Sequence, residues 1–230
     1  MNAPGMGPDD LLSRPIVLVV ALALVSLLPF AFMTVTAFVK IATVLQIVRS
    51  AIGAQSVPSS TVIMALAGAL TLLAMAPVGQ EIVDRAAPMF VGARSRDTTT
   101  LVREGVSAVI SPMREFLNTN ASDIDKARFL DVAKRSRSRS PGARGDVAPD
   151  DLTVLVPAFV VTQLTEAFAI GFLIYLPFLV IDLVVSNVLL ALGMQMMTPT
   201  QVSLPFKLLL FVAIDGWGLL SRALVAGYSR

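Results

Sequence analysis

Five ionisable side chains lie inside or at the ends of long apolar segments, where they could carry chemistry or bind another charge: Lys40, Glu166, Asp182, Lys207 and Asp215. A lone charge at the centre of a lipid bilayer costs about 2.5 to 3.5 kcal/mol even on lenient insertion scales. Each of these side chains therefore needs a compensating partner.

Two roles fit these five charges. The three carboxylates could relay protons near the midplane of a membrane, as in a secondary transporter. Alternatively, the acids and bases pair between helices or between subunits. We favour pairing, because two bases and three acids nearly neutralise one another without a transported ion. Lys207 and Asp215 are about 12 Å apart along a helix, so we expect each to find its partner on another helix.

The composition leaves little room for other chemistry. The chain of 230 residues has no histidine and no cysteine, which removes imidazole and thiol catalysis, disulfides and the usual zinc ligands. It contains no phosphate-binding glycine loop and no nucleophile elbow. We therefore expect no enzyme, no cofactor and no metal site. An aspartate-pair hydrolase is a weaker alternative. The net charge of +2 does not favour nucleic acid as a partner.

The elements that must position the charges are long apolar helices. Only 15% of the residues are charged and the mean hydropathy is +0.77, which is typical of an integral membrane protein. Residues 16–39 and 61–80 carry no charge and are each long enough to cross a bilayer as a helix. Residues 152–197 are about twice that length, and residues 202–228 complete the set. We predict an all-α, membrane-associated protein built from long kinked helical hairpins.

Two prolines are expected to interrupt these helices. Pro29 lies inside the first apolar segment, and Pro177 lies in the middle of the longest one. A proline inside a helix removes one backbone hydrogen bond and clashes with the preceding turn. We therefore predict a kink at Pro29 and a break at Pro177. In a straight helix, Glu166 and Asp182 would instead point to nearly opposite sides.

A small mixed-charge region separates the two apolar halves. Residues 81–151 hold twelve of the eighteen basic residues and eleven of the sixteen acids. We therefore predict three parts: an apolar hairpin over 1–84, a solvated helical insert over 85–150 and apolar helices over 151–230. Residues 98–117 and 124–134 are expected to form amphipathic helices, and the Arg- and Ser-rich stretch 135–147 a mobile loop.

Four residues at the end of the longest apolar segment form what we call the methionine turn: Met194, Gln195, Met196 and Met197. Methionine is flexible, polarizable and apolar, so its side chains can fill irregular gaps or adapt to varied partners. From composition alone, filling gaps between helices is the simpler interpretation.

Several long motifs, in order along the chain, resemble the SctR/FliP family of type III secretion export-gate proteins. The motifs are Thr36-Ala-Phe-Val-Lys40, Ala51-Ile-Gly-Ala-Gln55 with Pro58, Met75-Ala-Pro-Val-Gly79, Leu176-Pro-Phe-Leu-Val-Ile-Asp-Leu-Val184, Leu190-Ala-Leu-Gly-Met194, Ser203-Leu-Pro-Phe-Lys-Leu-Leu-Leu-Phe211 and Asp215-Gly-Trp217. Flagellar members typically begin with a cleaved signal peptide. The acidic pair Asp9 and Asp10 is unlike one, so we expect the first span to be retained and favour the injectisome (virulence or symbiosis) branch.

The resemblance implies a non-enzymatic subunit of a multi-pass inner-membrane assembly within the secretion-system basal body. A homo-pentamer would form a helical pore with SctS/FliQ-like and SctT/FliR-like subunits. It would work with SctU/FlhB-like and SctV/FlhA-like export components, in contact with lipid, and pass unfolded proteins. The family places the insert on the periplasmic side, whereas the arginine content alone favours the cytoplasm.

The resemblance also assigns a role to the methionine turn, which would form a gasket that closes the pore against ions. Gln195 interrupts the methionine triplet common in the family. Gln163 stands where many relatives have a glutamate, with Glu166 one turn later. The alternative function is a proton-coupled small-molecule transporter that uses Glu166, Asp182 and Asp215.

Overall fold

The computed structural model describes residues 8–53, 58–90, 98–138, 147–194 and 196–228, and its regular elements over these ranges are all helices. The all-α prediction is therefore confirmed. The helices are α1 (Pro8–Val35), α2 (Phe38–Ile52), α3 (Ser60–Ala74), α4 (Ala76–Phe90), α5 (Thr98–Asn120), α6 (Asp123–Ser138), α7 (Leu152–Ala191), α8 (Pro199–Ala213) and α9 (Gly216–Ala226).

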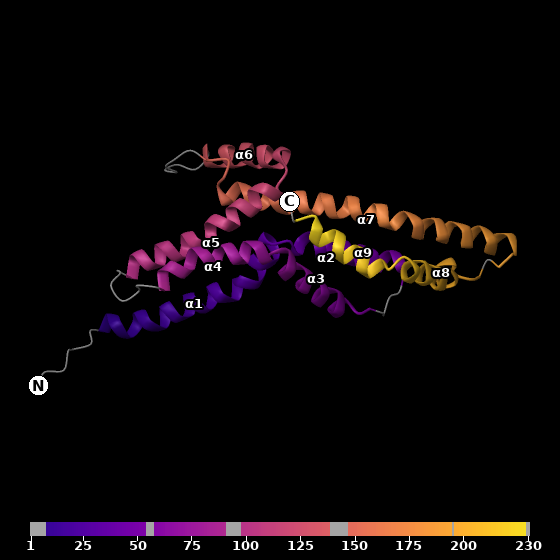
Figure 1. Cartoon of the computed structure of the whole chain (residues 1–230), viewed down its shortest axis with the longest axis horizontal. Helices are drawn as coiled ribbons and strands as arrows, with labels where there is room; N and C mark the ends of the chain where they lie inside the picture. The colour runs from indigo at the N-terminus through magenta and orange to yellow at the C-terminus, as the bar shows by residue number, and fades with distance from the viewer. Residues whose placement is uncertain (1–7, 54–57, 91–97, 139–146, 195, 229–230) are drawn as a thin grey trace, which may run out of the picture.

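The molecule is elongated, with arms that extend in two directions from a central crossing of helices (Figure 1). The α7–α8 hairpin projects to one side, and α1, α4 and α5 project to the other. Helix α2 lies at the crossing and makes its most extensive contact with α7. The centre of the structure is thus an α2–α7 pair to which the two arms are attached.

One face of α2 forms the middle of the main hydrophobic cluster. Ile41, Val44, Leu45 and Val48 recur at helical spacing and are completely buried. They pack with residues of α3, α7, α8 and α9. An apolar stripe of this period is what makes one helix face stable against its neighbours.

Helix α7 is a single helix of 40 residues, so the predicted break at Pro177 is wrong. Pro177 lies on the exposed side of the helix, where its ring does not disturb the core. The lost hydrogen bond is local. Packing continues on both sides of the proline, with Ala167 and Phe178 buried in the main cluster, and this packing keeps the helix continuous.

Pro29 does not end the first helix, and the sharp bend of this segment lies further along the chain. Helix α1 continues through Pro29, and the chain bends by 70° between Val35 and Phe38. At this bend the hydroxyl of Thr36 donates to the Phe32 carbonyl (2.7 Å) and accepts from the Phe38 amide (3.3 Å). The side chain of Thr36 thus competes for backbone groups and ends one helix where the next begins.

Two further bends divide apolar segments. Helices α3 and α4 meet at 53° around Met75, and α8 and α9 meet at 58° around Ile214 and Asp215. By length and composition, α7 could cross a membrane alone, and up to four spans result if each bent pair counts as one. Of the predicted apolar segments, the structure keeps one straight and bends three.

The predicted insert helices are present as α5 and α6, which pack with the first part of α7 in a second hydrophobic cluster. The predicted mobile loop at 135–147 is wrong at both ends, because α6 continues to Ser138 and Val147 is buried. An ion pair between Asp131 and Arg135 (2.9 Å), one helical turn apart, supports this extension. Residues 139–146 lie outside the described residues. Helix α4 also crosses the expected boundary at residue 84.

The contact between α2 and α7 depends on a glycine. A Cβ atom placed on Gly171 would lie 2.6 Å from Ile47 Cδ1 and 3.2 Å from Ile47 Cβ. Ile47 Cβ is bonded directly to the backbone, so it cannot move away unless helix α2 moves as well. Gly171 therefore allows the two helices to approach closely.

We predict that Gly171→Ala lowers the free energy of unfolding by about 1 to 3 kcal/mol, because it overpacks this contact. Adding Ile47→Ala should restore part of the loss. Gly79→Ala is the matched control: no atom lies within 4 Å of its added Cβ, so it should be neutral or stabilising by up to about 1 kcal/mol. Denaturant unfolding in mild detergent measures all three. An unchanged stability for Gly171→Ala would contradict the close contact.

Candidate functional site

An ion pair joins α7 to α8, and its buried lysine also binds the end of α2. Lys207 Nζ lies 2.6 Å from Asp182 Oδ2 and donates a second hydrogen bond to the Ala51 carbonyl at 3.2 Å. The other carboxylate oxygen of Asp182 accepts a hydrogen bond from Ser203 Oγ at 2.5 Å. Lys207 is only 3% exposed. One ammonium group therefore joins three helices in apolar surroundings.

A second ion pair joins α2 to the first half of α7. Lys40 Nζ contacts Glu166 Oε2, and it also lies 4.6 Å from the centre of the Tyr228 ring, in a cation–π contact. The Tyr228 hydroxyl donates to Gln163 Oε1, and Gln163 Nε2 donates to the Asn120 carbonyl at 2.9 Å. This network extends from α2 through α7 to the end of α5.

The two acids of α7 point to different helices because the helix is straight. Sixteen positions separate Glu166 from Asp182, which is about 24 Å along the axis and about 160° around it. Glu166 pairs with α2, whereas Asp182 pairs with α8. The structure therefore does not bring the α7 carboxylates together into one relay site.

Asp215 belongs to neither ion pair. It occupies the bend between α8 and α9 with φ 51°, a left-handed conformation that few residues other than glycine adopt, although Asp tolerates it. Its Oδ2 accepts a hydrogen bond from Arg222 at 3.1 Å, and both side chains are largely exposed. The sequence analysis placed Asp215 among charges in apolar segments, but within this chain it lies on the surface.

The methionine turn lies at the tip of the hairpin (Figure 1). Gly193 adopts φ 72°, its amide donates to the Leu190 carbonyl, and the Met194 amide donates to the Leu189 carbonyl at 2.9 Å. These two bonds form a Schellman motif, which ends the helix on a defined backbone. Met194 is 42% exposed and Met196 fully exposed, and Met197 also faces outward. Gln195 lies outside the described residues.

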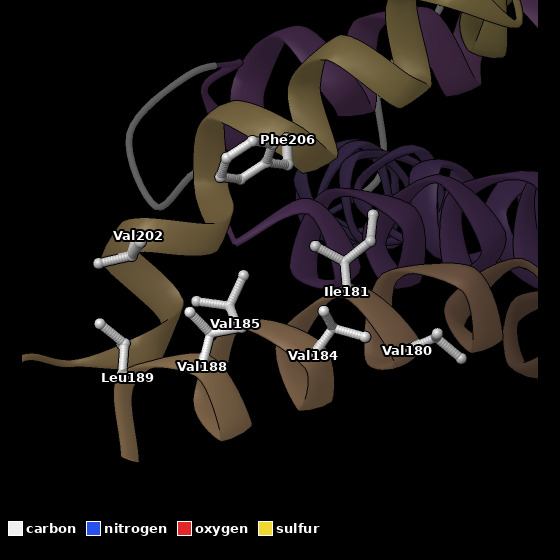
Figure 2. A pocket seen from close by; sticks show the side chains of 8 residues that line it. All are labelled: Val180, Ile181, Val184, Val185, Val188, Leu189, Val202 and Phe206. Carbon is white, nitrogen blue, oxygen red and sulfur yellow. The ribbon is translucent and has the colours of Figure 1, made fainter. Parts of the chain in front are cut away.

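An apolar groove of about 480 Å³ runs along the same hairpin. Figure 2 shows aliphatic side chains from one face of α7 around it, with Val202 and Phe206 from α8 opposite. The lining residues are Val180, Ile181, Val184, Val185, Val188, Leu189, Val202 and Phe206. This face of the hairpin therefore offers hydrophobic contact and no hydrogen-bonding side chain.

The sequence indicated the charges of this site and singled out Gln163 beside Glu166, but it gave no role to Ser203 or Tyr228. Ser203, Gln163 and Tyr228 supply the neutral polar contacts around the two ion pairs. The spacing of Ser203 and Lys207, four residues apart on one helix face, was a usable signal. Tyr228 had no local signal, because its partners come from α2, α5 and α7. Among the described residues, no three acidic side chains gather in a way that could bind a metal ion.

Comparison with known proteins shows which sequences this chain resembles. Residues 21–224 match the FliP family. The chain is 44% identical to the hypersensitivity response secretion protein HrcR of Ralstonia nicotianae, over 92% of this chain and 96% of that protein. It is 42% identical to the Yop proteins translocation protein R of Yersinia pestis (92% and 95%) and 40% identical to the virulence protein YscR of Salmonella typhimurium (94% and 97%).

Replacing the carboxylate by an amide should lower stability by different amounts in the two ion pairs. Asp182→Asn should lower the free energy of unfolding by about 2 to 3 kcal/mol, because it leaves the buried Lys207 charge without its counterion. Glu166→Gln should cost less than about 1 kcal/mol, because the Glu166 side chain is 50% exposed to water and Lys40, although buried, keeps its cation–π contact with Tyr228. Denaturant unfolding in detergent compares the two variants.

A double variant tests whether the loss of stability comes from the buried charge that is left unpaired. Replacing both partners by apolar residues, Asp182→Leu with Lys207→Met, should recover most of the loss, since no charge is then left buried. Equal losses for Asp182→Asn and Glu166→Gln would show that burial does not decide the strength of these pairs.

Proposed function

This chain belongs to the FliP family, and we propose that it is a non-enzymatic core subunit of a type III protein secretion export gate. The observation that carries this proposal is the similarity, over more than nine-tenths of each chain, to relatives named as secretion and translocation proteins. The apolar helices support a multi-pass position in the bacterial inner membrane, within the basal body of the secretion system.

The exposed surface supports an assembly rather than a single chain. The chain exposes 15544 Å², whereas a compact globular protein of its mass exposes about 10,000 Å². The excess of about 5,000 Å² is comparable to the area buried in large obligate interfaces. Exposed large apolar side chains lie on α1, α7 and α8. Protein partners or lipid must cover these faces.

The assembly that we propose is a homo-pentamer that forms a protein-conducting pore with SctS/FliQ-like and SctT/FliR-like subunits. SctU/FlhB-like and SctV/FlhA-like components would deliver unfolded substrates to it. The apolar groove between α7 and α8 and the exposed flank of α1 supply contact surfaces for such packing. The insert formed by α5 and α6 would lie on the periplasmic side, within the basal body.

The methionine turn is the part of the chain that we propose as the gate. Its helix ends in a defined Schellman turn, and the side chains beyond it extend away from the hairpin. A ring of such side chains from several copies would present thioethers to the pore centre. Flexible apolar side chains can close against hydrated ions and still adapt to different peptide side chains.

The alternative function, a proton-coupled transporter, finds less support. A relay needs carboxylates within hydrogen-bonding reach of one another or of water between them. Here Glu166 and Asp182 are each occupied by a lysine on a different helix, and Asp215 is exposed beside Arg222. The same charges are therefore better explained as helix-pairing groups.

We predict that the full-length chain, extracted in mild detergent after co-expression with its neighbouring membrane subunits, forms a homo-pentamer that retains two other small hydrophobic proteins. Native mass spectrometry reads the stoichiometry directly. A stable monomer or dimer that binds none of them would contradict the export-gate proposal and would favour the transporter.

The gate makes a separate prediction. Replacing Met194, Met196 and Met197 together by alanine should raise the resting ion conductance of the reconstituted complex several-fold and leave its stoichiometry intact, because the smaller side chains no longer fill the pore. The matched control is Met33→Ala on α1, where the methionine is 41% exposed, much like Met194. Conductance across planar bilayers measures both. Loss of the pentamer, or an unchanged conductance in an intact pentamer, would refute the gasket.

A further inference from the structure

Tyr228 lies where the insert meets the helical core. Its ring stacks on Phe116 of α5, with centroids 5.9 Å apart, and the Lys40 ammonium of α2 lies 4.6 Å from its ring centre. Its hydroxyl donates to Gln163 of α7. Tyr228 also packs against both hydrophobic clusters, the main one around α2 and the second one around α5 and α7. One side chain thus contacts three helices and both clusters.

The partners of Tyr228 are themselves fixed in place. Gln163 is 1% exposed, and its amide nitrogen holds the carbonyl of Asn120 at the end of α5. Phe116 is buried and contacts Phe159 of α7 with ring centroids 5.6 Å apart. Lys40 is held by Glu166. A movement of the Tyr228 ring would therefore disturb the end of α5 on one side and the Lys40 ion pair on the other.

We infer that Tyr228 is a positioning residue that fastens the insert to the helical core and couples the docking of α5 to the Lys40 ammonium. Three contacts of Tyr228 serve three different elements: the ring stacks on α5, the ring makes a cation–π contact with α2, and the hydroxyl binds α7. Loss of the ring would release the end of α5 without unfolding the α7–α8 hairpin. This inference does not depend on the export-gate proposal.

Hydrogen exchange of backbone amides in the intact detergent-solubilised complex tests the coupling helix by helix. Tyr228→Phe keeps both ring contacts and loses only the hydroxyl bond, so exchange in the last two turns of α5 should rise about two- to tenfold. Tyr228→Leu also removes the stacking and cation–π contacts, so the increase should exceed about tenfold. Exchange in α8 should stay unchanged in both variants.

A double-mutant cycle tests the link to Lys40. Lys40→Met should speed exchange at the end of α5 by about two- to fivefold, the factor expected for one lost cation–π contact. In the Tyr228→Leu background the same substitution should add nothing there, because the contact no longer exists. In the Tyr228→Phe background it should act as in the unmodified chain, because the ring remains.

Two matched controls come from the same chain. Lys207→Met removes the other buried lysine and should speed exchange in α8 but not in α5. Tyr175→Leu removes the only other tyrosine, which lies on α7 away from α5, and should leave α5 unchanged. The inference is overturned if Tyr228→Leu accelerates α5 and α8 equally, or if Lys40→Met affects α5 to the same extent with and without the Tyr228 ring. If Tyr228→Leu does not fold, the inference fails when Tyr228→Phe and Lys40→Met each leave α5 exchange unchanged.

Discussion

A charge in apolar surroundings must be paired, and this constraint sets the arrangement of the helices. Helix α7 carries two acids that point in different directions along a straight axis. Each can be neutralised only by a lysine from a different neighbour. Glu166 therefore brings in α2 and Asp182 brings in α8. Because Lys207 also binds the Ala51 carbonyl, at the end of α2, the two pairs connect the three helices into one frame.

The polar contacts determine how the helices of this chain meet, whereas the apolar surfaces are left for contact with other molecules. Ion pairs and buried hydrogen bonds are directional, so they specify which helices meet and in what register. The apolar faces of α1, α7 and α8 are not directional, and within this chain they remain largely exposed. A frame that is fixed internally by a few polar contacts can present these faces in a constant orientation. That property suits a subunit that packs against several copies and several partners.

Features that follow from local sequence could be predicted, whereas features that depend on tertiary contacts could not. The apolar helices, the two insert helices and the five charges follow from local pattern. The effect of Pro177 does not, because the packing of α7 on both sides of it decides whether the helix breaks. The bend after Val35 was not predicted, because it lies where the hydroxyl of Thr36, not a proline, competes for the helix backbone. The partners of Tyr228 come from three distant segments, and no single-sequence pattern encodes them.

The hairpin combines a rigid stem with an adaptable tip, and the physical reasons for the two differ. Two features fix the stem. One is the ion pair between Lys207 of α8 and Asp182 of α7, and the other is the Schellman turn that ends α7. Beyond that turn Met196 is fully exposed, so no packing contact within the chain fixes its rotamer, and Met194 and Met197 are each partly exposed. Methionine has three rotatable bonds, so its thioether can occupy many positions without moving the backbone. A closure made from such side chains can therefore change shape while the helices that carry it remain in place.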